Sequence, residues 1–387
     1  MKQIFFIITA FAIFSSIAVM AQEGEVSPDS LRLSFKPYGS FRGHFAFYNK
    51  DVEFQENGSR IGFEFSVKRK NTRFFVASEL QINMFKGNST FSADANLSGG
   101  FLVAEKTQQQ QVFGTRLGYL GVDLDKFGTI SVGKQWSVYY DITSYTDKFD
   151  VFGGQASATF VAGTDGGGIG TGRADQVLIY RNQFGPVYVG AQMQARTASN
   201  NEFIDGYGFS AQLKLLNGLK VGAAFNKGFL NKDIIDSHEV LGLTNQPGYV
   251  TVGASYISDN LELGAVYAHQ TNGDLAQGYI DDPVQGILTP TVVFDANGLE
   301  LYGKYKFGKM TVLAGYNNYN PDAEDITTPT GQKPLSPDFK KNYVILGLEY
   351  RPVNRAYFYA EQRFSNGKTA LGANEFDVAT IGIRIDI

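Results

Sequence analysis

Alternation of apolar and polar residues is the feature of this sequence that most constrains its fold. In the last seven residues, 381–387, every second residue is isoleucine, and the residues between are small or charged. A strand with this period of two has one apolar face and one polar face. In a water-soluble sheet the apolar face needs a covering layer, yet no segment of the chain has the pattern of a covering helix. Because the alternation recurs along the chain, we predict a transmembrane β-barrel with lipid outside and a water-filled lumen inside.

The N-terminal segment predicts export. Lys2 gives a short basic start, and the run 4–21 is apolar apart from three hydroxyl residues. Small or β-branched residues at 19–21 provide a cleavage site, so we predict a signal peptide over residues 1–21 and a mature protein over 22–387. No other run is apolar enough for a membrane helix, and the mean hydropathy of −0.16 argues against a helical membrane protein.

Composition agrees with an exported barrel. The chain has no cysteine, which argues against a small secreted domain held by disulfides. It has 44 glycines together with 32 phenylalanines, 21 tyrosines and one tryptophan, and such aromatic residues form girdles at both membrane interfaces. The net charge of −4 is too small to indicate a nucleic-acid partner.

The spacing of the alternating segments predicts the number of strands. Seven short turns alternate with eight long polar loops, as expected for short periplasmic turns and long external loops. The predicted fold is therefore all-β: a sixteen-stranded antiparallel transmembrane β-barrel whose third external loop folds inward. The predicted strands lie near 33–48, 58–69, 71–85, 111–124, 127–135, 173–182, 186–197, 205–216, 219–228, 248–258, 261–271, 298–307, 310–319, 340–350, 355–364 and 375–386.

Charged residues within the strands indicate which face meets water. A charge at the lipid midplane costs a few kcal/mol, so Arg60 and Glu79 are predicted to point into the lumen. One segment does not fit the alternation. Leu120 and Arg116 are four positions apart, so in a regular strand an apolar and a charged side chain would point to the same face.

The loop over residues 136–172 is longer than ordinary surface loops, and loops of this size are usually functional or disordered. It carries several tyrosines and phenylalanines, too much apolar surface to leave in water. We predict that this loop folds into the barrel mouth and narrows it. The alternative is a loop that packs over the top of the barrel.

The sequence around this loop resembles that of a known family. Residues 127–154 read FGTISVGKQWSVYYDITSYTDKFDVFGG. This run is similar to the fifth strand and constriction loop of the general (non-specific) Gram-negative outer-membrane porins, the trimeric sixteen-stranded type. Residues 59–63, 116–119 and 172–182 resemble that family's second strand, fourth strand and return into the sixth strand. The close match covers about 110–195.

The resemblance implies a homotrimer in which basic residues of each barrel wall face acidic residues of the inward loop. On the loop, Asp147 matches the family's acid, while the family's second acid falls on Val151 and the adjacent Asp150 is its substitute. This departure leaves the ion preference open. The chain also ends in Ile387, where the family favours phenylalanine. The matching basic cluster is Arg42, Arg60, Arg116 and Arg173.

The predicted function is a porin of the cell outer membrane that passes small hydrophilic solutes and ions by passive diffusion. Its expected partners are outer-membrane lipid, lipopolysaccharide, those solutes and two further copies of the chain. The alternative is a solute-specific channel for a sugar or an anion, or a plugged surface binding barrel. A ladder of lumenal aromatic rings would favour a sugar, and the candidates are Tyr302, Tyr343, Tyr357 and Tyr359.

We expect no enzyme, cofactor or metal. The three histidines lie far apart in the sequence, and the glycine-rich run 164–172 lacks the spacing of a phosphate-binding loop. Two external loops are rich in acidic residues, which we interpret as solvated side chains rather than Ca²⁺ ligands. They are Asp274, Asp281, Asp282 and Asp295 in the loop over 272–297 and Asp322, Glu324 and Asp325 in the next loop.

Overall fold

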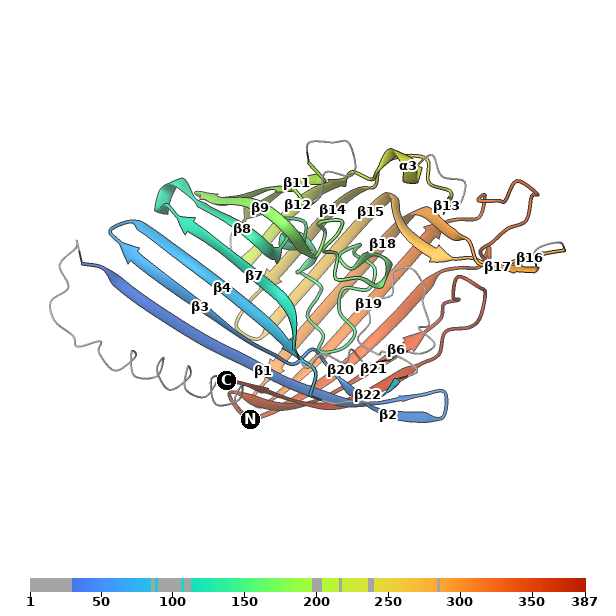
Figure 1. The fold of residues 1–387 in the computed structure, drawn as a ribbon. Helices are drawn as coiled ribbons and strands as arrows, with labels where there is room; N and C mark the ends of the chain where they lie inside the picture. The colour runs from blue at the N-terminus through green and yellow to red at the C-terminus, as the bar shows by residue number, and fades with distance from the viewer. Residues whose placement is uncertain are drawn as a thin grey trace, which may run out of the picture.

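Sixteen antiparallel strands close into one barrel in the computed structural model of the protein (Figure 1). The structure describes residues 30–84, 88–89, 106–107, 113–196, 204–215, 218–235, 240–283 and 286–387. The predicted signal peptide lies outside the described residues. The barrel closes where the first strand, β1 (Arg32–Tyr48), pairs with the last, β22 (Val378–Asp386). Ile387 extends this ladder, since its N–H and C=O both bond with Gly39.

The other barrel strands pair with their neighbours in sequence. They are β3 (Arg60–Arg69), β4 (Thr72–Ile82), β7 (Phe113–Asp123), β8 (Thr129–Trp136), β9 (Arg173–Phe184), β10 (Val187–Gln194), β11 (Gly206–Lys214), β12 (Leu219–Gly228), β14 (Gly248–Ile257), β15 (Leu261–Gln277), β18 (Thr291–Phe307), β19 (Met310–Asp322), β20 (Lys341–Val353) and β21 (Ala356–Ser365).

Smaller elements decorate the barrel. The short strands are β2 (Asp51–Glu56), which pairs with β1, β13 (Val240–Leu241), which pairs with β18, and the hairpins β5 (Asn88–Ser89) with β6 (Lys106–Thr107) and β16 (Ile280–Asp282) with β17 (Gly286–Leu288). The helical turns are η2 (Asp125–Phe127), α2 (Tyr140–Thr143), η3 (Val161–Gly163) and α3 (Lys232–Ile235).

The sixteen predicted strands are confirmed, with differences in length. β18 begins at Thr291 rather than near 298, and β15 continues to Gln277 rather than ending near 271. These extensions pair with each other beyond the irregularity between Gln270 and Asp274. Alternation does not reveal the start of β18, because the apolar residues Val292, Val293 and Phe294 follow one another there and are all buried.

The outward face of the wall is apolar, as the alternation predicts. Ile381, Ile383 and Ile385 are 56%, 40% and 42% exposed, although isoleucine is usually buried in a water-soluble fold. Large apolar side chains are exposed on most of the other wall strands as well, which is the surface expected of a barrel in lipid. Among the helices in the described part of the chain, none has the length and apolar character needed to span a bilayer.

The irregular parity around Arg116 arises from a β-bulge. The β4–β7 register passes from Glu79 opposite Leu117 to Leu80 opposite Thr115, so Arg116 is the extra residue on β7. A bulge of this kind re-aims side chains and reverses the alternation beyond it. Leu120 therefore points outward and is 59% exposed, while Arg116 reaches inward to Glu79.

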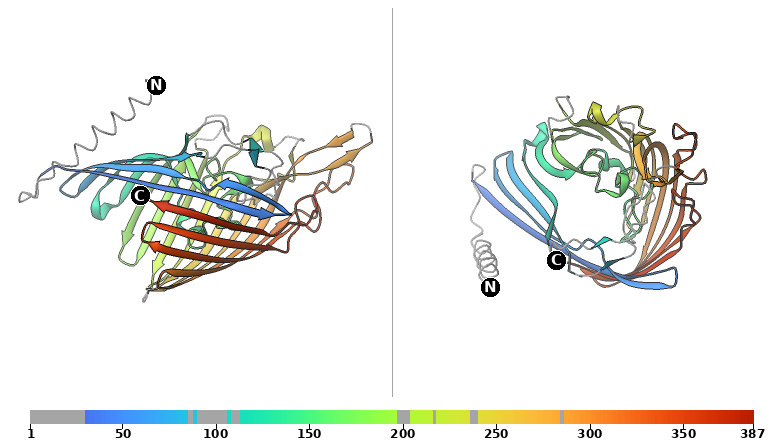
Figure 2. Two further views of the ribbon diagram at one scale, coloured as in Figure 1. Left: turned by 90° about the horizontal axis from the view of Figure 1, so that it is seen from below. Right: turned by 45° about the vertical axis from the view of Figure 1, so that its right-hand side comes forward.

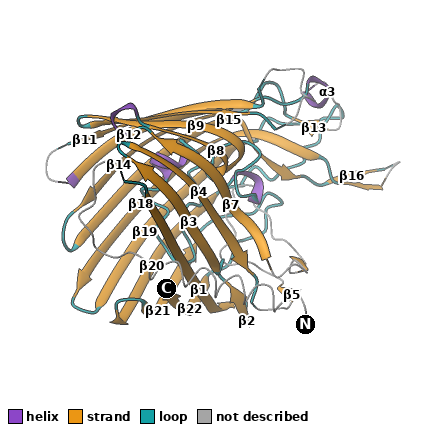
Figure 3. Cartoon of the chain, turned by 60° about the vertical axis from the view of Figure 1, so that its left-hand side comes forward, coloured by secondary structure: helices purple, strands orange, loops and turns teal. Residues whose placement is uncertain are grey.

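The segment between β8 and β9 lies inside the ring of strands, as predicted (Figures 2 and 3). Hydrogen bonds seat it on the wall: the Val138 N–H donates to Gln192 Oε1 at 2.8 Å, and the Ala156 N–H donates to Glu300 Oε1 at 2.6 Å. The wall strands beneath it carry glycines where loop atoms approach most closely. A Cβ at Gly298 would overlap the Ala156 carbonyl. The same close approach recurs at Gly190, Gly222, Gly253, Gly264 and Gly315.

Candidate functional site

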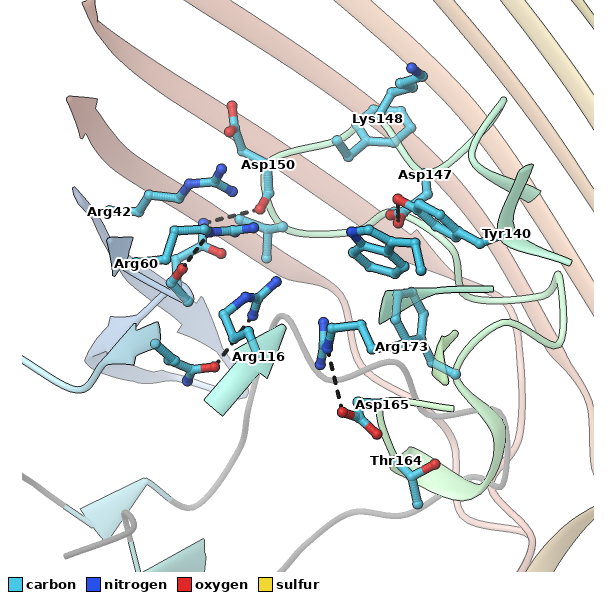
Figure 4. Close-up of a pocket in the computed structure, with 18 of the residues that line it drawn as sticks. Arg42, Arg60, Arg116, Tyr140, Asp147, Lys148, Asp150, Thr164, Asp165 and Arg173 are labelled. Carbon is cyan, nitrogen blue, oxygen red and sulfur yellow. Dashed lines mark hydrogen bonds and ion pairs between the residues drawn. The ribbon is translucent and has the colours of Figure 1, made fainter. Parts of the chain in front are cut away.

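A cavity of about 550 Å³ lies between the inward loop and one side of the barrel wall. All six residues singled out by the sequence line it, so the fold brings together side chains that lie up to 131 positions apart in the chain. Figure 4 shows the guanidinium groups of Arg42, Arg60, Arg116 and Arg173 directed into the same space. The remaining two are Asp147 and Asp150, both from the loop.

The basic residues come from different strands of the wall. Arg42 lies on β1, Arg60 on β3, Arg116 on β7 and Arg173 at the start of β9. A fifth arginine, Arg384 on β22, also lines the cavity and was missed by the sequence analysis. Its position among the isoleucines of 381–387 was a usable signal, because every residue between them faces inward. We call Arg42, Arg60, Arg116, Arg173 and Arg384 the arginine wall.

The carboxylate that neutralises the middle of the arginine wall is on the wall itself. Glu79 Oε1 lies 2.7 Å from Arg116 Nε and 3.8 Å from Arg60 Nη1. Its other oxygen accepts a hydrogen bond of 3.0 Å from the Tyr38 hydroxyl. Glu79 is only 7% exposed, so this ion pair is largely shielded from solvent. The sequence analysis placed Glu79 in the lumen but did not predict these partners.

Arg173 has a second acidic partner that was not predicted. Asp165 Oδ2 lies 3.4 Å from Arg173 Nε and 2.8 Å from Lys134 Nζ. Burial acts to raise the pKa of Asp165, but the hydrogen bond from Lys134 and the two neighbouring cations outweigh it and hold the pKa below its ordinary value. The guanidinium of Arg173 also stacks near two rings, with its carbon 5.5 Å from the centroid of Trp136 and 5.9 Å from that of Phe160.

Asp147 lines the same cavity, but its direct bonding partners belong to its own loop. Its carboxylate accepts a hydrogen bond of 2.9 Å from the Tyr140 hydroxyl and packs against the backbone at Gly153. Among the described residues it forms no ion pair. Burial raises the pKa of Asp147, and the hydrogen bond from Tyr140 offsets only part of that effect. Asp147 therefore holds the loop together more than it faces the arginine wall.

Asp150 engages the end of the arginine wall. Its Oδ1 lies 3.1 Å from Arg384 Nη1 and accepts a hydrogen bond of 2.9 Å from the Tyr357 hydroxyl. The backbone beside it is held by Glu361, whose carboxylate accepts the N–H groups of residues 150, 151 and 152 at 2.7, 3.0 and 3.3 Å. The family has a second acidic residue on this loop, and this chain has Val151 at that position. The carboxylate bonded there is that of Glu361, which lies on the wall strand β21.

The tyrosines considered for a sugar-binding ladder are engaged by the loop or its neighbours. Tyr302 packs edge-on against Phe149, and Tyr359 accepts a hydrogen bond from Asn57 while Tyr343 donates one to Glu375. All four are no more than 4% exposed, and none lines the cavity.

The acidic external loops do not assemble a metal site in the part of the chain that the structure describes, where no group of three or more potential ligands comes together. Asp274 instead accepts a hydrogen bond of 2.6 Å from the Tyr319 hydroxyl, and Asp295 accepts one of 2.6 Å from the backbone N–H of Asn272.

Comparisons with known proteins agree with one another. A family model described as Gram-negative porin matches residues 8–370. Outer membrane porin F of Salmonella typhi is 28% identical over 237 residues, covering 58% of this chain and 61% of that protein. Outer membrane porin PhoE of Klebsiella pneumoniae is 24% identical over 319 residues, covering 80% of this chain and 83% of that protein.

Solved structures show the same fold. OmpF of Salmonella typhi, in a complex with daunomycin, has a TM-score of 0.66 at 19% identity and covers 93% of this chain and 98% of that one. An anion-selective porin from Comamonas acidovorans has a TM-score of 0.61 at 16% identity and covers 92% of this chain and 100% of that one. At these identities the likeness establishes the architecture alone.

Proposed function

The chain belongs to the Gram-negative porin family, and from this membership we propose that it forms a water-filled channel for passive diffusion of small hydrophilic solutes and ions. The protein resides in the cell outer membrane, and its relatives are named as porins rather than enzymes. The alignment with the Salmonella porins spans 61% of their length, so the transport activity of the whole protein is proposed here.

The observation that carries the proposal is the polar cavity at the loop. Of the side chains that line it, six are arginine or lysine and three are aspartate, and they lie inside a barrel whose apolar side chains point outward. A narrow space between a low-dielectric wall and fixed charges focuses the electric field. Hydrated ions and polar solutes are stabilised there, whereas an apolar solute displaces oriented water without compensation. Transport of this kind needs only shape and charge.

The solute-specific alternative loses its main support from the tyrosines. A sugar channel needs exposed aromatic faces along the path, but Tyr302, Tyr343, Tyr357 and Tyr359 are buried under the loop and its neighbours. Trp136 lines the cavity, yet its ring is stacked on Tyr140 with centroids 3.9 Å apart and has Arg173 nearby. A general channel therefore fits the geometry better than a sugar-specific one.

We also propose a homotrimer embedded in lipid and lipopolysaccharide. The support is the resemblance of residues 110–195 to trimeric porins and the trimer form of OmpT from Vibrio cholerae, a structural neighbour with a TM-score of 0.59. Chemical cross-linking of the protein in native membranes should give a three-chain species.

Single-channel recording in planar bilayers tests the proposed function. We expect ohmic conductance steps in potassium chloride that neutral sugars reduce only by viscosity, because the four tyrosines of the predicted ladder are buried and do not line the cavity. A closed barrel with no conductance would refute the channel, and saturable block by a sugar would favour the solute-specific alternative.

Replacing Asp147 with asparagine should change ion selectivity only slightly, because its carboxylate faces Tyr140 rather than the arginine wall. The raised pKa also means that Asp147 takes up a proton at a higher pH than an ordinary aspartate. Lowering the pH should therefore move the selectivity of the wild type in the same direction, toward anions, as Asp147→Asn does at neutral pH. Asp165→Asn, which removes the partner of Arg173 and Lys134, is the matched control and should give a larger shift in reversal potential. Equal shifts in the two variants would contradict this assignment.

A further inference from the structure

We propose that the arginine wall contains an oxyanion subsite centred on Arg42 and Arg60, and that the channel prefers solutes that carry a carboxylate or phosphate group over neutral or cationic solutes of the same size. The inference rests on the proposed channel function and assigns a substrate class to it.

The first observation is a like-charge pair built into the barrel closure. Arg42 on β1 and Arg384 on β22 are direct cross-strand partners. Like charges directly opposite each other on adjacent strands destabilise a sheet unless an anion offsets them. Arg384 has such anions, with its Nε 2.9 Å from Asp386 Oδ1 and its Nη1 3.1 Å from Asp150 Oδ1. Among the described residues no carboxylate comes within ion-pair distance of Arg42.

Arg42 is therefore the least neutralised member of the wall. Its Nε donates a hydrogen bond of 2.8 Å to the Ser40 hydroxyl, a neutral partner. The positive charge of its neighbour Arg60 is only weakly neutralised by a carboxylate. Arg60 Nε donates to the Gly58 carbonyl at 3.0 Å, and its Nη1 is 3.8 Å from Glu79, a carboxylate that Arg116 holds at 2.7 Å. Positive potential is thus concentrated where β1 and β3 meet.

The second observation is that the loop supplies little opposing charge. Asp147 is turned to Tyr140 and packs against its own loop backbone. Val151 stands between Asp150 and Phe152 and contributes no charge, while its backbone N–H is already bonded to Glu361. The carboxylates that remain, Asp150 and Asp165, are bound to arginines of the wall. A solute in the cavity therefore meets more positive than negative charge, since five arginines and Lys148 line it against three aspartates.

The side chains also have the chemistry that recognises an oxyanion. Guanidinium groups present planar sets of N–H donors that match a carboxylate or phosphate, and such charge-assisted bonds are roughly twice as strong as neutral ones. The Arg60 side chain is 19% exposed and faces the cavity together with Arg42. Partial burial limits screening by salt, so the preference should persist at physiological ionic strength.

The experiment measures ion preference and block in the whole protein reconstituted in planar bilayers. Reversal potentials in a potassium chloride gradient should show that chloride is favoured over potassium. Arg42→Gln should lower the chloride-to-potassium permeability ratio by about two- to fivefold, the effect of one unit charge a few ångströms from an ion in water. Inorganic phosphate and propionate should reduce the chloride current of the wild type, and uncharged ethylene glycol should not.

Two controls separate a subsite from a general effect of charge. Arg73→Gln removes the same charge from a lumenal ion pair with Glu64 and Asp123 that does not line the cavity, and it should leave the permeability ratio nearly unchanged. Arg42→Lys should restore the ratio but weaken the block by phosphate and propionate, because lysine keeps the charge and loses the planar donors. Block by phosphate alone would restrict the ligand class to phosphates.

The outcomes distinguish this inference from the function on which it rests. Absence of conductance would overturn the channel proposal and the subsite with it. A conducting wild type that prefers potassium, or an Arg73→Gln variant that shifts selectivity as much as Arg42→Gln does, would overturn the subsite and leave the channel intact. A lower conductance or stability of Arg42→Gln does not change this test, because the chloride-to-potassium permeability ratio is measured only in channels that conduct.

Discussion

Replacing Gly298 with alanine should destabilise the barrel by about 2–6 kcal/mol and lower its conductance. A Cβ at this position overlaps the carbonyl oxygen of Ala156, and the backbone on both sides is fixed. The loop must move away from the wall and into the lumen, which breaks the hydrogen bond of 2.6 Å between the Ala156 N–H and Glu300. Overpacking costs about 1–3 kcal/mol, and leaving a buried polar group without its partner costs about 1–3 kcal/mol. Thermal unfolding in detergent and single-channel recording measure the two effects.

The matched control is Gly303→Ala on the same strand. Gly303 points outward, and the nearest atoms to a Cβ there are Leu263 Cδ2 at 3.5 Å and the Ala314 carbonyl at 3.9 Å, which are ordinary contacts. A methyl group added to the lipid face should change stability by less than about 0.5 kcal/mol and leave the conductance unchanged. If Gly298→Ala behaves like Gly303→Ala, the loop is not seated on this wall.

Replacing Arg60, Arg116 and Arg173 together with alanine should reverse the ion preference of the channel. The substitutions remove three positive charges and also leave Glu79 and Asp165 without their partners in the arginine wall. Each unit charge contributes about 0.5–1 kcal/mol at distances of 4–8 Å in water, so three of them change the permeability ratio by roughly tenfold to a hundredfold toward cations. Removal of three long side chains should also widen the cavity and speed the entry of larger zwitterions. Reversal potentials and liposome swelling measure these changes.

Glu79→Gln provides the opposite test at the same place. It leaves Arg60 and Arg116 without their shared carboxylate, so anion preference should rise above that of the wild type. In the triple variant, adding Glu79→Gln should recover part of any lost stability, because an unpaired carboxylate at a site only 7% exposed is costly. Wild-type selectivity in the triple arginine variant would show that the narrowest part of the path lies elsewhere.

Local periodicity was enough to predict the barrel, because each strand has an apolar face that suits lipid and a polar face that suits water. The isoleucines of 381–387, the short turn at Gly308 and the long loop after Trp136 each have a physical meaning without reference to the rest of the chain. The extensions of β15 and β18 escaped prediction because they do not alternate; in β18 the buried residues Val292, Val293 and Phe294 follow one another.

Only some of the residues that line the cavity could be predicted from the sequence. Arg42, Arg60, Arg116 and Arg173 were found because they match a family resemblance, and the structure places them around one cavity. The alternation of 381–387 indicates that Arg384 points inward, but it does not give the register that brings Arg384 opposite Arg42. That pairing is a property of barrel closure.

The sequence by itself determined the fold, the strand count and, outside the bulge at Arg116, the side of the wall on which the strand charges lie. These follow from the period of two and from the cost of charge in lipid. Only the tertiary structure decided which charges meet. The register of β4 against β7 and the bulge at Arg116 bring Glu79 to two arginines, and the path of the loop turns Asp147 toward Tyr140. Pairing of charges depends on ångström-scale distances between strands that are remote in sequence, and alternation carries no information about those distances.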